Sequence, residues 1–165
     1  MPLFPAFLDL SDASVLIVGE GAEADRKAAK MVPFCKKILR CPYPPSYSER
    51  PALVLLTQKD HPENEVWAAR FRAQHIPVNV ADRPELCDFR FPGLIARGDV
   101  SVGVATDGRA PALAALLRER IEQALPEDLE AILDAAADLT AELRKTTPDQ
   151  QERARLLREE LQKLL

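Results

Sequence analysis

The fold of this 165-residue chain is decided by the stretch Ser14-Val-Leu-Ile-Val-Gly-Glu-Gly-Ala-Glu-Ala24. Residues 14–18 form a β-branched apolar run of the kind found in strands that are buried on both faces. Residues 19–24 fit the pattern G-x-G-x-x-A, and the following residues, Asp25 to Val32, predict a helix that Pro33 ends. Strand, glycine turn and helix in this order predict the start of a parallel α/β sheet.

The glycine turn is also the first candidate ligand site. Gly19 permits a tight turn, Gly21 permits a close approach of the backbone to a pyrophosphate, and Ala24 permits close packing of the helix on the strand. The N–H groups at the start of such a helix favour anionic ligands. A plain strand-to-helix turn is the alternative interpretation, and it is the surrounding strand and helix that favour a nucleotide site.

The segment after the helix carries both a charge and a loop of interest. A second strand is expected at Lys37 to Cys41, and Arg40 lies where dinucleotide-binding sheets usually carry an Asp or Glu for the ribose. Arg40 either favours NADP by pairing with a 2′-phosphate or is an exposed strand residue. The following segment, Pro42 to Pro51, contains four prolines and predicts an extended loop.

The α/β alternation continues beyond this loop. Residues 52–57 and 77–80 predict two further buried strands, and the helix between them is expected to run from a cap at Asp60, with Pro62 in its first turn, to about Gln74. Strands that alternate with helices favour a parallel sheet, whose ligands bind beyond the carboxyl ends of the strands.

The pattern changes after Asp82. Residues 93–96 and 100–105 predict a hairpin, and the chain from Pro111 onward predicts three amphipathic helices. The third helix is expected to open with a capping box at Thr147-Pro-Asp-Gln150. A small hairpin offers little surface for three apolar stripes, so a second subunit is expected to cover part of them.

Composition excludes several classes of function. A formal charge of −4 argues against nucleic acid as the main partner. No apolar run approaches the roughly 20 residues of a membrane span, and residues 1–12 carry no Lys or Arg, so we expect a cytoplasmic, unprocessed protein. The spacing of the three cysteines and two histidines favours neither a disulfide framework nor a metal site.

Two further places carry candidate chemistry. Asp82 follows a strand at the edge where such sheets bind ligands, and its carboxylate is suited to accept a proton from a substrate. The alternative is a helix N-cap, because Asp82-Arg-Pro-Glu85 has a carboxylate three residues after the Asp. Thr106-Asp-Gly108, between the hairpin and the next helix, either contributes polar groups to a ligand or is simply a turn.

These residues together resemble the precorrin-2 dehydrogenase or sirohydrochlorin ferrochelatase family, which is also the N-terminal domain of siroheme synthase. The resemblance covers most of the chain in the family's order. The matching blocks are Pro2-Leu-Phe4, Leu8-Asp-Leu10, Val15 to Lys27, Asn79 to Pro84, Phe89-x-Phe-Pro92, VGVATDG ending at Gly108, and Ala110 to Pro126.

The resemblance implies NAD-dependent oxidation of the tetrapyrrole precorrin-2 to sirohydrochlorin by a homodimer, with NADP as the less favoured cofactor. Some members also insert ferrous iron, which is then a substrate and needs no protein metal site. The implied acid/base residue is Asp82. The implied cofactor contacts are Gly19, Gly21, Ala22, Ala24 and Thr57, and the implied substrate contacts are Arg83, Thr106 and Arg109, with Arg90 and Arg97 as further arginines for substrate carboxylates.

One departure from the family stands out. Members usually have a further strand where this chain has only Pro42 to Pro51, so the predicted fold is α/β with a shortened Rossmann-like parallel sheet, followed by a hairpin and a helical region. The expected divisions are a nucleotide-binding domain at 1–82, a dimerisation region at 83–125 and a helical region at 126–165. The shortened lobe also leaves open a non-catalytic relative that binds a tetrapyrrole or nucleotide in a carriage or regulatory role.

Overall fold

The computed structural model describes residues 3–43 and 45–164. Pro2 of the family block and Pro44 of the proline-rich loop therefore lie outside the described residues, as do Met1 and Leu165. The chain divides into two compact units, one ending at Phe91 and one beginning at Pro92. No helix in the described ranges has both the length and the apolar character to cross a membrane.

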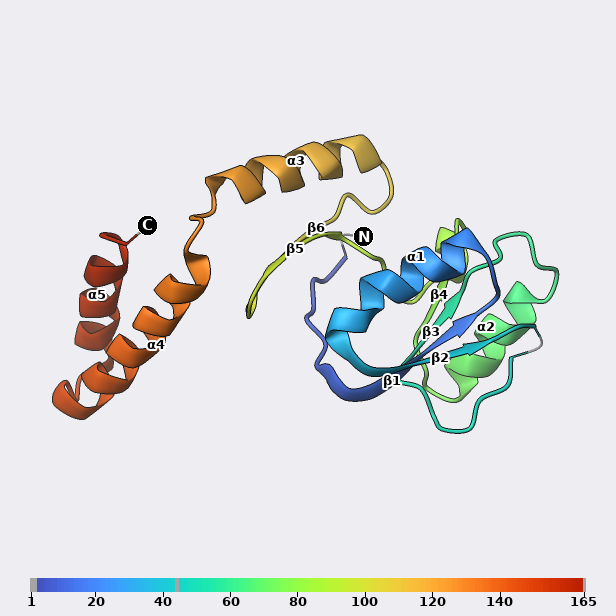
Figure 1. Ribbon diagram of the computed structural model, residues 1–165, viewed down its shortest axis with the longest axis horizontal. Coiled ribbons are helices and arrows are strands. Elements are labelled where there is room, and N and C mark those ends of the chain that lie inside the picture. Colours follow the sequence, from blue (N-terminus) through green and yellow to red (C-terminus); the bar gives the residue numbers. More distant parts are fainter. Residues whose placement is uncertain (1–2, 44, 165) are drawn as a thin grey trace. The chain divides into compact units, whose positions relative to one another are not determined.

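The first unit is built on a four-stranded sheet with the order β2-β1-β3-β4 (Figure 1). All three neighbouring strand pairs are parallel, which confirms the predicted sheet. The strand order reverses between β1 and β3, and this switch point is where doubly wound sheets bind their ligands. The strands are β1 (Leu10–Val18), β2 (Cys35–Cys41), β3 (Leu53–Leu56) and β4 (Val78–Val80).

Helices cover the two faces of this sheet because successive side chains of β1 point to opposite sides. Val15 and Ile17 pack with residues of α1 (Ala22–Met31), whereas Leu16 and Val18 pack with residues of α2 (Asn64–Ala73). Both helices therefore begin near the carboxyl ends of the strands and bury one apolar side against the sheet.

The proline-rich loop connects β2 to β3. Its described residues contain neither helix nor strand, which confirms the predicted loop. Tyr43 and Tyr47 pack against the same cluster as Leu16 and Val18, and the ring of Tyr47 lies 5.9 Å from that of Phe71 in α2. The two tyrosine rings thus extend the apolar cover on this face of the sheet.

The second unit holds the predicted hairpin and three helices. The antiparallel pair is β5 (Gly93–Arg97) and β6 (Val100–Val104), followed by α3 (Pro111–Ala124), α4 (Leu129–Thr146) and α5 (Gln150–Leu161). The guanidinium of Arg97 donates to the carbonyl oxygens of Pro126 (3.0 Å) and Glu122 (3.4 Å), which fixes the hairpin to the end of α3. This arginine therefore has a structural role.

The predicted caps of two helices were wrong. The N-cap of α2 is Glu63 rather than Asp60, because Pro62 and Glu63 form a turn ahead of the helix, which begins at Asn64. The helix α5 begins at Gln150 with Asp149, not Thr147, as its N-cap: the Asp149 carboxylate accepts the N–H of Glu152 at 2.7 Å. Thr147 is unsuited to this role since it ends α4 and its own N–H donates to Leu143.

The cap at Asp149 is testable. We expect Asp149→Ala to destabilise α5 by about 1 kcal/mol, because the N–H of Glu152 loses its acceptor. Hydrogen exchange of the α5 amides should then accelerate about fivefold. Thr147→Ala is the control and should leave α5 exchange unchanged. Equal acceleration in both variants would contradict the assignment of Asp149 as the cap.

Candidate functional site

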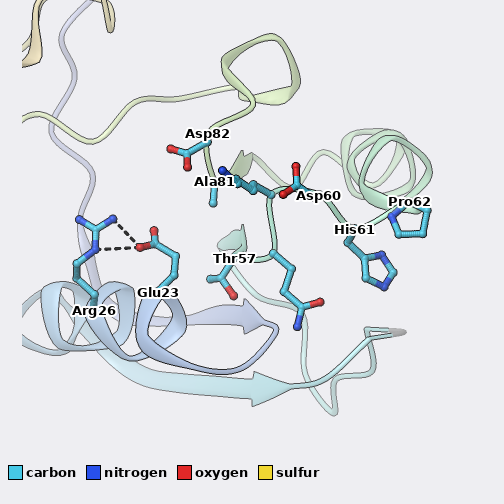
Figure 2. Close-up of a pocket in the computed structure, with 10 residues that line it drawn as sticks. Glu23, Arg26, Thr57, Asp60, His61, Pro62, Ala81 and Asp82 are labelled. Carbon is cyan, nitrogen blue, oxygen red and sulfur yellow. Dashed lines mark hydrogen bonds and ion pairs between the residues drawn. The ribbon is translucent and has the colours of Figure 1, made fainter.

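A cleft of about 600 Å³ lies at the carboxyl edge of the parallel sheet. Figure 2 shows Glu23 and Arg26 of α1 on one side, with Thr57 and Asp82 between them and the segment of His61. Thr57 directly follows β3, and Asp82 follows β4 after one residue. The structure thus brings the glycine turn, Thr57 and Asp82 to one edge. The full lining is Glu23, Arg26, Thr57, Gln58, Lys59, Asp60, His61, Pro62, Ala81 and Asp82.

The glycine turn has the backbone form that a phosphate cradle needs. Gly19 has a φ of +109°, and a Cβ there would lie 2.5 Å from Oγ1 of Thr57. Gly21 caps α1 at φ +86° and ψ −170° with no side-chain hydrogen bond, and a Cβ there would meet nothing within 4 Å. The first N–H groups of α1 have no acceptor within the helix. This turn therefore fits the pyrophosphate of a dinucleotide.

Acidic side chains at the same helix end oppose an anion unless they are neutralised. Glu23 and Asp25 lie in the first turn of α1. Arg26 pairs with Glu23 at 2.6 Å, and Arg40 of β2 pairs with Asp25 at 2.6 Å. These pairs offset the negative charge near the turn. Arg40 is thereby engaged by Asp25, although both side chains are exposed to solvent.

Thr57 forms the floor of the cleft. Its hydroxyl donates to the carbonyl oxygen of Val18 at 2.9 Å, and its backbone N–H donates to the same oxygen at 3.0 Å. The residue is buried. Its side chain therefore holds the ends of β1 and β3 together directly beneath Gly19.

Asp82 has a strained backbone and a free carboxylate. Its φ is +54°, a left-handed conformation that is uncommon outside glycine and tolerated best by Asn and Asp. The short 3₁₀ helix η2 (Pro84–Leu86) has Arg83 at its N-cap, with no side-chain cap bond, so the predicted cap at Asp82 was wrong. Because Pro84 fixes the helix start, the turn at Asp82 lies one residue too early to cap it. Among the described residues its carboxylate has no hydrogen-bond partner, and it lines the cleft.

The predicted substrate contacts divide between the two units. The Arg83 guanidinium pairs with Glu65 at 3.1 Å and with Glu85, and hydrogen bonds to both carboxylates raise the pKa of Arg83. Thr106 and Arg109 belong to the second unit, where the N–H of Arg109 donates to the carbonyl oxygen of Thr106 at 3.0 Å. Arg83 is thus committed to ion pairs, whereas the other two residues form a turn ahead of α3.

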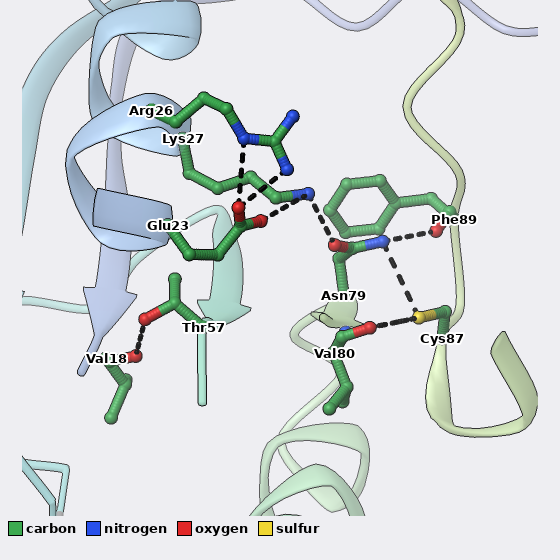
Figure 3. Close-up of polar contacts among 9 residues, drawn as sticks. All are labelled: Val18, Glu23, Arg26, Lys27, Thr57, Asn79, Val80, Cys87 and Phe89. Carbon is green, nitrogen blue, oxygen red and sulfur yellow. Dashed lines mark hydrogen bonds and ion pairs between the residues drawn. The ribbon is translucent and has the colours of Figure 1, made fainter. Parts of the chain in front are cut away.

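A polar network that sequence reasoning missed connects α1 to the end of β4 (Figure 3). The ammonium of Lys27 donates to Oδ1 of Asn79 at 3.2 Å and lies 4.1 Å from the centroid of the Phe91 ring. Asn79 in turn donates to the carbonyl oxygen of Phe89 at 3.0 Å. Burial lowers the pKa of Lys27. The network fixes the strand that ends just before Asp82 to the helix that begins at the glycine turn.

A second missed feature is an aromatic pair at the rim of the cleft. The rings of Tyr43 and His61 stack with centroids 3.6 Å apart and planes inclined by 14°. The Tyr43 hydroxyl donates to Oδ1 of the buried Asn64 at 2.5 Å, and Asn64 donates to the carbonyl oxygens of Gln58 (2.8 Å) and Lys59 (3.0 Å). Burial raises the pKa of Tyr43. The pair joins the loop after β2 to the loop after β3.

The described residues contain no group of three or more His, Cys, Asp and Glu side chains placed to hold a metal ion. All three cysteines are free thiols. Among the described residues, the site therefore combines backbone N–H groups with the carboxylates of Asp60 and Asp82, which have no hydrogen-bond or ion-pair partner, and with the paired charges of Glu23 and Arg26.

Two family models match the chain. One is described as "Putative NAD(P)-binding" and covers residues 38–93; the other is described as "Sirohaem biosynthesis protein central" and covers residues 97–124. The first match begins after the glycine turn and includes the residues around Thr57 and Asp82. The phosphate cradle is therefore supported by the structure rather than by this match.

Known proteins resemble the chain over most of its length. It is 32% identical over 170 residues to a siroheme synthase of Psychrobacter sp. (strain PRwf-1), covering 90% of this chain and 35% of that protein. It is 34% identical over 171 residues to the siroheme synthase of Methylococcus capsulatus (strain Bath), covering 90% of this chain and 36% of that protein. The chain thus spans about a third of the length of the curated relatives it matches.

A solved structure shares the fold. The protein described as "SirC, precorrin-2 dehydrogenase" superposes with a TM-score of 0.65 at 17% identity, covering 95% of this chain and 88% of that chain. This likeness confirms the predicted α/β fold followed by a hairpin and helices.

The two glycines of the turn make a matched pair for mutation. Both have positive φ, so alanine costs about 1–3 kcal/mol of backbone strain at either position. Gly19→Ala should lower the free energy of unfolding, measured in urea, by about 1–3 kcal/mol more than Gly21→Ala. The reason is that a Cβ at position 19 meets Thr57, whereas a Cβ at position 21 meets nothing. Equal losses would mean that the close approach of Gly19 to Thr57 does not contribute to stability.

Proposed function

We propose that this chain is an NAD-dependent dehydrogenase that oxidises precorrin-2 to sirohydrochlorin, because it is similar over 90% of its length to about a third of two siroheme synthases. The observation that carries the proposal is the position of Asp82. Its carboxylate faces a cleft whose other wall begins at the glycine turn, and it has no partner among the described residues. A free carboxylate beside a phosphate cradle suits an oxidation that releases a proton as well as a hydride.

The chain's own residues supply binding, positioning and proton transfer. Gly19, Gly21 and the first N–H groups of α1 (Ala22 to Ala24) would hold the pyrophosphate. The nicotinamide, when bound, supplies the acceptor for the hydride. Asp82 accepts the proton that the tetrapyrrole loses in the same oxidation, so that one hydride and one proton leave the substrate. The network of Lys27 and Asn79 keeps Asp82 at a fixed distance from α1.

Precorrin-2 carries several carboxylates, and Arg83, Thr106 and Arg109 are each proposed to bind one of them. Arg83 would exchange its ion pairs with Glu65 and Glu85 for a substrate carboxylate. In this proposal the cofactor binds to the expected region at 1–82 and the subunits pair through the region at 83–125. The region at 126–165 is the helical extension. NAD is proposed over NADP because Arg40, the residue placed to meet a 2′-phosphate, pairs with Asp25.

Two other activities remain as separate proposals. Insertion of ferrous iron uses the macrocycle's own nitrogens as ligands, so it needs no metal site on the chain; its rate with ready-made sirohydrochlorin and Fe²⁺ tests it. A non-catalytic role in carriage or regulation is favoured by the proline-rich loop that replaces a strand. Absence of turnover with either NAD or NADP would favour that role over the dehydrogenase.

Asp82→Asn separates catalysis from stability. Asn tolerates the same left-handed backbone, and no hydrogen bond of the carboxylate is lost, so the free energy of unfolding should change by less than about 0.5 kcal/mol. Formation of sirohydrochlorin, followed by absorbance with precorrin-2 and NAD, should fall by about 10²–10⁴-fold, because the proton acceptor is lost.

The opposite result for Asp82→Asn would contradict a catalytic role for Asp82. An unchanged rate together with a loss of stability would make Asp82 a structural residue. NADH binding, measured by fluorescence, serves as the control, since Asn keeps the shape of the cleft and should leave the affinity unchanged.

A homodimer is proposed from the uncovered face of α3. Leu116 and Leu117 lie three and four positions after Leu113, so the three leucines share one face of α3, and Leu116 is 57%, Leu117 38% and Leu113 50% exposed. Each leucine gains about 1.5–3 kcal/mol from full burial, which a second copy can supply. Leu116→Glu should therefore give monomers in sedimentation velocity, while Ala115→Glu, on a different side of α3, should remain dimeric. A monomeric wild-type protein would refute the proposal.

A further inference from the structure

The loops after β2 and β3 lie where the adenosine half of a dinucleotide is expected. In dinucleotide-binding sheets the ribose is met about 20 residues after the glycine turn, at the end of the second strand. In this chain that position is the end of β2, at Arg40 and Cys41. The adenine base is expected beyond the ribose, between the end of β2 and the loop that follows β3, the strand on the other side of β1. That second loop is the segment from Gln58 to Pro62.

The stacked rings of Tyr43 and His61 span this space. Tyr43 comes from the loop after β2 and His61 from the loop after β3, and their centroids are 3.6 Å apart. A base placed between two rings needs them about 7 Å apart, twice the contact distance of roughly 3.5 Å. The present spacing therefore leaves no room for a purine between the two loops.

Hydrogen bonds on both loops hold the two rings in place in addition to their stacking contact. The Tyr43 hydroxyl donates to the buried Asn64, which also binds the backbone of Gln58 and Lys59. Nδ1 of His61 accepts the N–H of Glu63 at 3.3 Å. Separation of the rings would disturb contacts on both loops. The aromatic pair therefore acts as a fixed wall of the cleft.

The end of β2, where the ribose is expected, has few groups suited to binding it. The acidic residue that would bind the ribose hydroxyls is replaced by Arg40, and this arginine pairs with Asp25 at 2.6 Å. Pro42, the next residue after β2, has no N–H to donate. The pyrophosphate turn is thus intact, whereas the adenosine end has lost both its ribose acceptor and the space for its base.

We propose that Tyr43 and His61 close the adenosine end of the cleft, so that the chain recognises the nicotinamide and phosphate portion of its cofactor and gains little affinity from the adenosine. This inference rests on the proposed function, since it concerns the cofactor of that reaction. The ligand class is a nicotinamide mononucleotide unit, whether free or as half of NAD.

The test compares NADH with reduced nicotinamide mononucleotide by fluorescence titration of the full chain. Wild-type protein should bind the two ligands with dissociation constants within about threefold of each other. His61→Asn removes the ring but keeps an acceptor for the N–H of Glu63, and it should tighten NADH binding about tenfold without changing mononucleotide binding. His75→Asn, outside the cleft, is the matched control and should behave as wild type.

Other outcomes decide between failure of this inference and failure of the proposed function. NADH bound more than thirtyfold tighter than the mononucleotide, and weakened by His61→Asn, would make His61 a stacking platform for adenine and overturn the inference alone. NADH bound only by His61→Asn would support the inference. Absence of binding of either ligand to wild type and variant would overturn the inference together with the nicotinamide cofactor of the proposed function.

Discussion

The contact between Thr57 and the carbonyl oxygen of Val18 is the constraint on which the cleft depends. Both the hydroxyl and the N–H of Thr57 donate to that one oxygen, at the point where the strand order reverses. The chain must then leave β1 over the Thr57 side chain, and only Gly19 fits there, because a Cβ would lie 2.5 Å from Oγ1. The turn, the start of α1 and the floor of the cleft all follow from this approach.

Local patterns were sufficient to predict the elements but not their ends. The buried strands, the glycine turn and the hairpin follow from short apolar runs and turn residues, and the structure confirms them. The predicted caps at Asp60, Asp82 and Thr147 failed because a cap requires a particular backbone conformation, and neighbouring prolines and tertiary contacts determine it. A residue type suitable for capping is therefore a weak predictor beside a proline.

The candidate site was predicted only where it coincides with strand ends. Gly21 and Asp82 follow β1 and β4, so the topology of a parallel sheet brings them to one edge. Lys27 and Asn79 are 52 positions apart, and Tyr43 is separated from its partner His61 by the strand β3. Neither pair produces a periodic pattern, so neither was accessible from a single sequence.

The proline-rich loop also links the packing of the core to the choice of ligand. Tyr43 and Tyr47 add to the apolar cover that α2 gives to one face of β1. The hydroxyl of Tyr43 also needs a partner, and it donates to Asn64, which in turn binds the backbone of the loop after β3. His61 is in that loop. Tyr43 therefore both packs against the core and narrows the adenosine end of the cleft. A substitution of Tyr43 would change core packing and ligand preference together. His61 lies outside the core, which makes it the position where ligand preference can change while the sheet remains covered.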